Sequence, residues 1–144
     1  MAVHNFPAHY VPNYRADMVK FPGLPVGAWR GPRHNVAGFA LQSFVDEMAH
    51  EAGKDPLAFR LDLLKGRGKT EFTDYGATHL DSDRVIGVLK LAAEKAGWGK
   101  PLPKGHGQGI ANYFTFGGYA AYVVEVKVEN GQVKIIKAVG AVDS

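Results

Sequence analysis

Cysteine is absent from the 144 residues, and this absence removes several classes of function at once. Without thiols the chain can form no disulfide, hold no metal through thiolate ligands and use no cysteine nucleophile. Long apolar runs are also missing, because no stretch approaches the roughly 20 residues that a membrane-spanning helix requires. The N-terminal residues lack a basic segment followed by an apolar run, which a signal peptide needs. We therefore expect a cytoplasmic protein with no membrane partner.

The chain also lacks a large excess of charge of one sign. Its 17 lysine and arginine residues are scattered among 14 acidic residues, which leaves a formal net charge of +3. Nucleic-acid-binding domains usually concentrate basic residues in a patch or stripe, so we expect no nucleic-acid partner. Apolar residues make up 46% of the chain and charged residues 22%, as in ordinary globular proteins. The length predicts a single domain, residues 1–144, with a core of its own.

Side chains for metal binding or hydrolysis are present but poorly spaced. No two of the six histidines stand at the i, i+4 spacing of a helical metal site, so we predict no metal ligands. Asp46 and His50 are four residues apart and are expected to form a surface pair. Ser43 lacks the glycine elbow of a hydrolase nucleophile. These patterns predict no catalytic residue within the chain.

Local signals predict an α+β fold made of three successive regions. Residues 1–32 are expected to be extended or loop, because prolines interrupt them, with a short strand around residues 14–19. Residues 33–97 are expected to be helical, with Gln42 on the polar side of the first helix. Residues 105–144 are expected to form an antiparallel sheet. The expected helices are Asn35–Ala52, one starting at Pro56 and ending before Gly66, and Asp83–Ala96, with a polar loop over 66–81.

The predicted sheet has three strands with a clear turn between the last two. The strands are expected at Ile110–Phe116, Tyr119–Val128 and Val133–Val142, and Asn130-Gly131 is typical of a type I′ hairpin turn. The glycine-rich segment 105–109 precedes a strand rather than a helix, so we interpret it as a strand entrance and not as a phosphate cradle. Strand aromatics usually pack in a core. We expect this of Tyr113, Phe114, Phe116, Tyr119 and Tyr122.

The segment from Pro25 to Pro32 is the most unusual part of the chain. Gly27 and Gly31 flank Trp29-Arg30, and glycines allow a tight bend with a close backbone approach to another group. The guanidinium of Arg30 offers a rigid fork of donors suited to an oxyanion or to the edge of a heterocycle. A simple loop that leads into a helix explains the same composition. The residues alone therefore leave both interpretations open.

Several collinear segments resemble the molybdopterin-binding large subunit of the xanthine dehydrogenase/aldehyde oxidase family. The resemblance is strongest to the branch that contains the isoquinoline 1-oxidoreductase beta-subunit, and the run Phe44–Arg60 (FVDEMAHEAGKDPLAFR) is its most specific part. Further matching segments are Tyr10–Arg15 (YVPNYR), Pro25–Arg30 (PVGAWR), Ala93–Trp98 (AEKAGW), Gly107–Ala111 (GQGIA) and Val139–Asp143 (VGAVD). At Ser144 the chain departs from the family, which has cysteine there.

This resemblance implies a cofactor and a set of partners. In the family the arginine of the W-R loop lies beside molybdopterin, so Arg30 is the expected cofactor-facing residue, with Gly27, Trp29 and Gly31 shaping the loop. Enzymes of this kind hydroxylate an aldehyde or an N-heterocycle and pass electrons to iron–sulfur centres in another subunit or domain. The expected partners are therefore an iron–sulfur subunit and the remaining part of the large subunit or a complementary chain.

The resemblance also implies that this chain alone is inactive. The family's catalytic base is a glutamate in a G-G-V-G-E segment, and these residues do not occur here. Without a base to deprotonate a metal-bound hydroxide, the reaction cannot proceed. An alternative is a truncated, non-enzymatic binding or assembly module that pairs with another subunit. The last predicted strand has an unpaired edge, which invites pairing with a partner or self-association.

Overall fold

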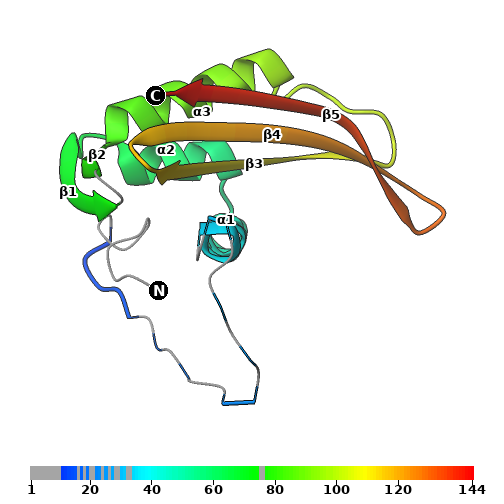
Figure 1. Cartoon of the computed structure of the whole chain (residues 1–144). Coiled ribbons are helices and arrows are strands. Elements are labelled where there is room, and N and C mark those ends of the chain that lie inside the picture. The colour runs from blue at the N-terminus through cyan, green and yellow to red at the C-terminus, as the bar shows by residue number, and fades with distance from the viewer. Residues whose placement is uncertain are drawn as a thin grey trace.

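The computed structural model describes residues 11–15, 17, 19, 22–23, 25, 27, 30–31, 34–74 and 77–144. Within these ranges the chain forms three helices and five strands (Figure 1). The helices are α1 (His34–Glu51), α2 (Pro56–Leu64) and α3 (Ser82–Ala96), and the strands are β1 (Lys69–Asp74), β2 (Ala77–Asp81), β3 (His106–Thr115), β4 (Gly118–Glu129) and β5 (Gln132–Asp143). This architecture confirms the predicted α+β class.

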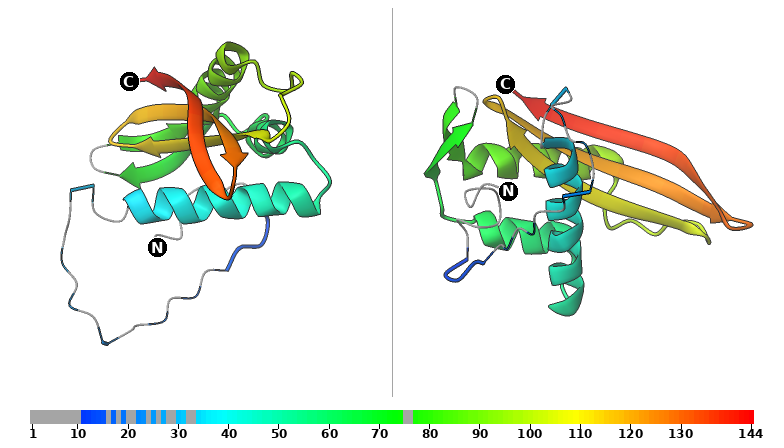
Figure 2. Two further views of the ribbon diagram at one scale, coloured as in Figure 1. Left: turned by 90° about the vertical axis from the view of Figure 1, so that its right-hand side faces the viewer. Right: turned by 60° about the horizontal axis from the view of Figure 1, so that its bottom comes forward.

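The main sheet has the antiparallel order β3-β4-β5, and α3 packs against one of its faces. α2 packs against α3, whereas α1 is seen end-on beside β3 in Figure 1. Figure 2 shows from two further directions that α1 lies apart from α3, on the β3 side of the sheet. The core lies between α3 and the sheet and consists of Leu64, Leu80, Val85, Val88, Leu89, Ala92, Ala93, Ile110, Phe114, Tyr119, Ala121, Val123 and Ala141.

Local capping signals account for the helix boundaries. Asp55 accepts a hydrogen bond from the amide of Ala58 at 2.9 Å, and Pro56 occupies the start of α2. Asp81 accepts from the amide of Asp83 at 3.0 Å and caps α3. Gly97 has a φ of +77° and ends α3 in the left-handed conformation that glycine tolerates. None of the helices in the described ranges combines the length and apolarity needed to cross a membrane.

Residues 66–81 depart from the predicted polar loop, because β1 and β2 pair there as an antiparallel ladder. The prediction was wrong because these strands carry almost no apolar alternation. Leu80 is the residue of β2 that joins the core, and it is 4% exposed. The backbone carbonyl of Gly68 accepts hydrogen bonds from both the amide and the hydroxyl of Ser82, which closes this hairpin onto the start of α3. Tertiary packing, rather than local pattern, therefore forms the hairpin.

Both turns of the main sheet contain two residues with positive φ. Asn130 (+51°) and Gly131 (+73°) join β4 to β5, which confirms the predicted hairpin turn. Phe116 (+52°) and Gly117 (+79°) join β3 to β4, so the expected strand position of Phe116 was wrong. Thr115 pairs with Gly118, which leaves only two residues to reverse the chain.

The beginning of β3 and the N-terminal region also differ from expectation. β3 begins at His106 rather than Ile110, because Gly107 and Gly109 pair in register with β4 instead of forming an entrance. The described residues before His34 form no helix or strand, so the short strand expected around 14–19 is not seen there. Two of its residues, Ala16 and Met18, lie outside the described residues.

The aromatic residues of β3 and β4 are divided between the two faces of the sheet. Phe114 and Tyr119 are buried in the core, as expected. Phe116 lies in the turn and Tyr122 points away from α3, so both are exposed and the core prediction was wrong for them. Alternation along a strand places neighbouring residues on opposite faces, and only one face is covered by α3. Tyr113 is half-buried.

Candidate functional site

The predicted cofactor-facing loop joins the first turn of α1. Gly27 and Arg30 are exposed and Gly31 is half-buried, whereas Trp29 lies outside the described residues. Gly31 has a φ of +67°, and a Cβ there would lie 2.9 Å from Asn35 Oδ1. Its carbonyl accepts a hydrogen bond from the amide of His34 at 3.1 Å. Glycine is thus required at position 31 for both backbone conformation and space.

His34 fastens this loop to the main sheet. Its Nδ1 lies 3.3 Å from the hydroxyl of Tyr113, and its Nε2 lies 3.3 Å from the hydroxyl of Thr115. The imidazole also contacts the rings of Tyr113 and Phe116, with centroid distances of 5.9 and 5.7 Å. His34 therefore holds the chain that follows Gly31 against the β3–β4 turn. No pattern in the sequence had indicated this role for His34.

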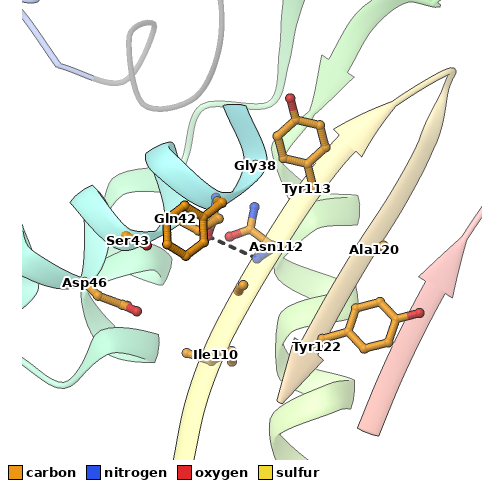
Figure 3. Close-up of a pocket in the computed structure, with 11 residues that line it drawn as sticks. Gly38, Gln42, Ser43, Asp46, Ile110, Asn112, Tyr113, Ala120 and Tyr122 are labelled. Carbon is orange, nitrogen blue, oxygen red and sulfur yellow. Dashed lines mark hydrogen bonds between the residues drawn. The ribbon is translucent and has the colours of Figure 1, made fainter. Parts of the chain in front are cut away.

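A pocket of about 390 Å³ opens between α1 and the sheet (Figure 3). Apolar and aromatic side chains form most of its surface, and a few polar groups converge on it, as in many small-ligand sites. Tyr113, which binds His34, is one of its walls, so the pocket adjoins the anchor of the Arg30 loop. The lining residues are Gly38, Phe39, Gln42, Ser43 and Asp46 from α1 and Ile110, Ala111, Asn112, Tyr113, Ala120 and Tyr122 from the sheet.

Arg60 lies behind the polar wall of the pocket and holds two of the lining side chains in place. Its guanidinium is completely buried and donates to Asp46 Oδ1 at 2.7 Å and to Gln42 Oε1 at 3.2 and 3.3 Å. The backbone carbonyl oxygens of Gln42 and Pro56 accept two further hydrogen bonds from the Arg60 guanidinium. A buried cation needs such partners because burial removes its hydration. Asp46 is therefore an ion-pair partner of Arg60 across two helices, and the expected surface pair with His50 was wrong.

Gln42 links this network to the sheet. Its Oε1 also accepts a hydrogen bond from the backbone amide of Asn112 at 3.1 Å, which satisfies a donor on the outer edge of β3. The prediction that Gln42 lies on the polar side of its helix was wrong, because the residue is buried. Among the described residues, Asn112 Oδ1 is a buried oxygen with no hydrogen-bond partner. The pocket wall thus contains one acceptor that the described part of the chain leaves unused.

Two glycines allow the aromatic walls to approach closely. A Cβ on Gly38 would lie 3.4 Å from the ring of Tyr113, which packs against α1 at this point. A Cβ on Gly140 would lie 2.6 Å from the ring of Tyr122, which covers the backbone of β5. The sequence gives no local signal for either contact, because each joins residues from distant parts of the chain.

A second polar cluster fixes the end of β5 to α3. Arg84 donates through Nε and Nη2 to the two carboxylate oxygens of Asp143, at 2.7 and 2.6 Å. Its Cζ lies 4.3 Å from the centroid of the Tyr119 ring, and the hydroxyl of Tyr119 accepts from the amide of Asp81. The hydrogen bond with Arg84 lowers the pKa of Asp143 and, in return, raises the pKa of Arg84. This cluster stabilises the packing of the sheet on α3.

The pocket is arranged for binding rather than for acid–base chemistry. Ser43 lines it, but none of the described histidines does, and Asp46 is engaged by Arg60. In the part of the chain that the structure describes, no three histidine or carboxylate side chains are grouped to hold a metal ion. The features suited to binding are the aromatic walls, the side-chain amide of Asn112 and the neighbouring Arg30 loop.

No established family profile matches the chain. It is 40% identical over 80 residues to the membrane-bound aldehyde dehydrogenase (pyrroloquinoline-quinone) of Gluconacetobacter polyoxogenes, covering 51% of this chain and 9% of that protein. It is 27% identical over 155 residues to a nicotinate dehydrogenase subunit of Pseudomonas putida, covering 94% of this chain and 12% of that protein. The chain thus spans about a tenth of the length of these relatives. It is distantly similar to members of the molybdenum hydroxylase family and corresponds to a small fraction of each.

Proposed function

We propose that this chain forms part of the molybdopterin-binding region of a molybdenum-dependent hydroxylase that oxidises an aldehyde or an N-heterocycle. The observation that carries the proposal is the alignment of 94% of the chain with the nicotinate dehydrogenase subunit of Pseudomonas putida. The position of the Arg30 loop supports it, because the loop is joined to α1 and adjoins a pocket.

Arg30 is the residue that would contact the cofactor. Its side chain is exposed, and the loop leads directly into the N-terminus of α1, where free helix amides attract anions. A cation beside a helix N-terminus suits the phosphate of molybdopterin, so these residues fit one edge of that group. Gly27 and Gly31 would let the backbone approach it, and Trp29 would complete the loop. The bound cofactor would supply the redox-active metal, while the chain would bind and orient it.

Turnover requires a further polypeptide in this proposal. The described part of the pocket offers no free carboxylate or histidine to serve as a base, and the G-V-G-E segment is missing from the sequence. The remaining large-subunit polypeptide would supply the base, and an iron–sulfur subunit would accept the electrons. A non-enzymatic assembly module is the second candidate, and the uncovered face of the main sheet favours it.

The cofactor content of the purified chain tests the first part of the proposal. Because the name of one relative includes pyrroloquinoline-quinone, molybdenum, oxidised pterin fluorescence and quinone should all be measured. We expect less than stoichiometric molybdenum and no aldehyde or nicotinate oxidation by the chain alone. Stoichiometric molybdenum together with turnover would refute the requirement for a second polypeptide.

A chimera tests the role of Arg30. In the nicotinate dehydrogenase of Pseudomonas putida, the matched segment would be replaced by this chain and the protein expressed with its companion polypeptide. We expect Arg30→Ala to lower molybdenum occupancy about tenfold, which corresponds to the loss of one charge-assisted hydrogen bond. Arg15→Ala is the matched control, because Arg15 is exposed and forms a surface pair with Asp17. Equal occupancy in the two variants would exclude Arg30 as a cofactor contact.

A further inference from the structure

The side-chain amide of Asn112 belongs to the wall of the pocket between α1 and the sheet. Asn112 is 6% exposed, and its Oδ1 is a buried oxygen without a hydrogen-bond partner among the described residues. Figure 3 shows this side chain in the space between α1 and β3, beside Gln42. Buried polar side-chain atoms in proteins nearly always have a partner, so an oxygen of this kind marks a position at which a hydrogen-bond donor would bind.

The polar neighbours of Asn112 are bound to one another instead. Gln42 Oε1 accepts from Nε and Nη2 of Arg60 and from the backbone amide of Asn112. Nη1 of Arg60 donates to Asp46 Oδ1 and to the carbonyl of Pro56. This network satisfies the buried cation and the backbone of β3, but it leaves the side-chain oxygen of Asn112 to a group outside the network.

The other walls of the pocket suit a flat ring. The aromatic side chains of Phe39, Tyr113 and Tyr122 line it, and Ala111 and Ala120 add only a methyl group each. The volume of about 390 Å³ lies at the small end of the range for ligand pockets. Aromatic walls that surround a single free polar atom are typical of sites that hold and orient an aromatic ligand.

The charges around the pocket favour a neutral ligand. None of the lysine, arginine and histidine side chains that the structure describes is among the lining residues, so an anion finds no counter-charge there. Asp46 lines the pocket, but its carboxylate is paired with Arg60 at 2.7 Å. A charged ligand would therefore lose hydration without gaining an ion pair.

We propose that this pocket binds a neutral, flat aromatic molecule that donates one hydrogen bond, from a ring N–H or an O–H, to Asn112 Oδ1. The last side-chain torsion of asparagine has a broad distribution, so a small rotation of the amide turns this oxygen toward the ligand. The site binds its ligand without making or breaking a covalent bond. It does not rest on the proposed cofactor function, since it uses neither Arg30 nor a bound metal.

Two ligands of nearly equal shape test the hydrogen bond. Indole carries a ring N–H, whereas 1-benzothiophene has the same fused-ring outline and no donor. In calorimetric titrations of the chain, indole should bind about fivefold to tenfold more tightly than 1-benzothiophene. Asn112→Leu keeps a side chain of similar size and should abolish this preference. The variant should be no less stable than the unmodified chain, because it removes an unsatisfied buried oxygen and keeps the backbone bond to Gln42.

The position of the ligand is tested separately. Indole should shift the amide signals of Gly38 and Ala111 in ¹⁵N-labelled chain, because both residues line the pocket. Ala120→Phe fills the pocket and should abolish these shifts. Leu91→Phe is the matched control, since Leu91 is exposed on α3 and is not one of the lining residues.

Three results in the chain alone would overturn the proposal. They are no saturable binding of indole up to its solubility limit, equal affinities for indole and 1-benzothiophene, and tighter binding of indole-3-carboxylate than of indole. An aromatic side chain of another polypeptide is the other source of the same chemistry, and the chimera with the Pseudomonas putida protein distinguishes it. If the chimera no longer binds indole, the larger polypeptide fills the pocket and the small-molecule site is refuted. Binding that persists in the chimera and is lost on Asn112→Leu supports it.

Discussion

Gln42 Oε1 accepts a hydrogen bond from the backbone amide of Asn112 at 3.1 Å, and this bond connects α1 to the edge of β3. The same oxygen accepts from the buried guanidinium of Arg60. One side-chain carbonyl therefore satisfies donors from a strand and from a second helix. The wall of the pocket depends on this single amide.

We predict that Gln42→Leu destabilises the fold by about 2 to 4 kcal/mol, because it removes the side-chain acceptor of three buried N–H groups, two of Arg60 and one of Asn112. Gln42→Glu should be milder, since a carboxylate keeps an acceptor for Arg60. Ser43→Ala is the control, because Ser43 lines the same pocket. The free energy of unfolding from urea titrations measures the effect. Equal stability of Gln42→Leu and Ser43→Ala would show that this bond contributes nothing.

The ion pair between Arg60 and Asp46 gives a second prediction. Asp46→Ala leaves a fully buried guanidinium with only neutral partners, which should cost about 2 kcal/mol. The half-exposed position of the carboxylate keeps this below the cost expected for a completely buried pair. Asp62→Ala is the comparison, because the Asp62–Lys54 pair has the same 2.7 Å distance but lies on the surface. We expect urea unfolding to show a clear loss for Asp46→Ala and little change for Asp62→Ala.

The helices and the last hairpin could be predicted from the sequence because their signals are local. Asp55-Pro56, Asp81, Gly97 and Asn130-Gly131 each act through their own backbone neighbours. The β1–β2 hairpin has no comparable signal, because it depends on packing of Leu80 in a core formed by distant residues.

The candidate site was predictable only in part for a related reason. The Arg30 loop was recognised from its composition and its resemblance to a family. The pocket beside it depends on Gln42 and Asn112, which are 70 positions apart in the chain. Helical periodicity placed Gln42 on the polar side, since a polar residue is normally expected there. Only the position of β3 beside α1 explains why this amide is buried.

The pair formed by Arg84 and Asp143 predicts a specific dependence of stability on pH. The hydrogen bond from Arg84 lowers the pKa of Asp143 in the folded state. Because the pKa is lowered, the ionised Asp143 stabilises the fold, and this stabilisation is complete above the unfolded-state pKa of about 3.9. The stabilisation is lost as the pH falls below that value and through the lower folded-state pKa. Asp143→Asn should therefore lower the melting temperature at pH 7, and the difference should shrink as the pH falls below about 3.9.

Glu51→Gln is the control for this experiment, because Glu51 is exposed at the end of α1. Its melting temperature should follow that of the unmodified chain across the same pH range. A constant difference between Asp143→Asn and the unmodified chain down to pH 2.5 would mean that the charge of Asp143 has no part in the effect.

Phe116 holds a backbone conformation that does not suit a bulky side chain. Its φ of +52° lies in the left-handed region, where residues with a Cβ lose about 1 to 2 kcal/mol relative to the right-handed region. The ring is 60% exposed, so its contact with His34 offsets only part of this cost. Asparagine tolerates the conformation and is favoured in such two-residue turns. We therefore expect Phe116→Asn to stabilise the chain by about 0.5 to 1 kcal/mol.

Phe116→Leu separates the cost of the left-handed backbone from the contribution of the ring contact with His34. It removes the aromatic contact with His34 but keeps the strained backbone, so it should be less stable than the unmodified chain. Thermal unfolding of the three proteins ranks them directly, with asparagine highest and leucine lowest. If Phe116→Asn is instead the least stable, the contact with His34 outweighs the strain. The aromatic ring would then be a support for the loop that carries Arg30, since His34 is the residue that ties this loop to the sheet.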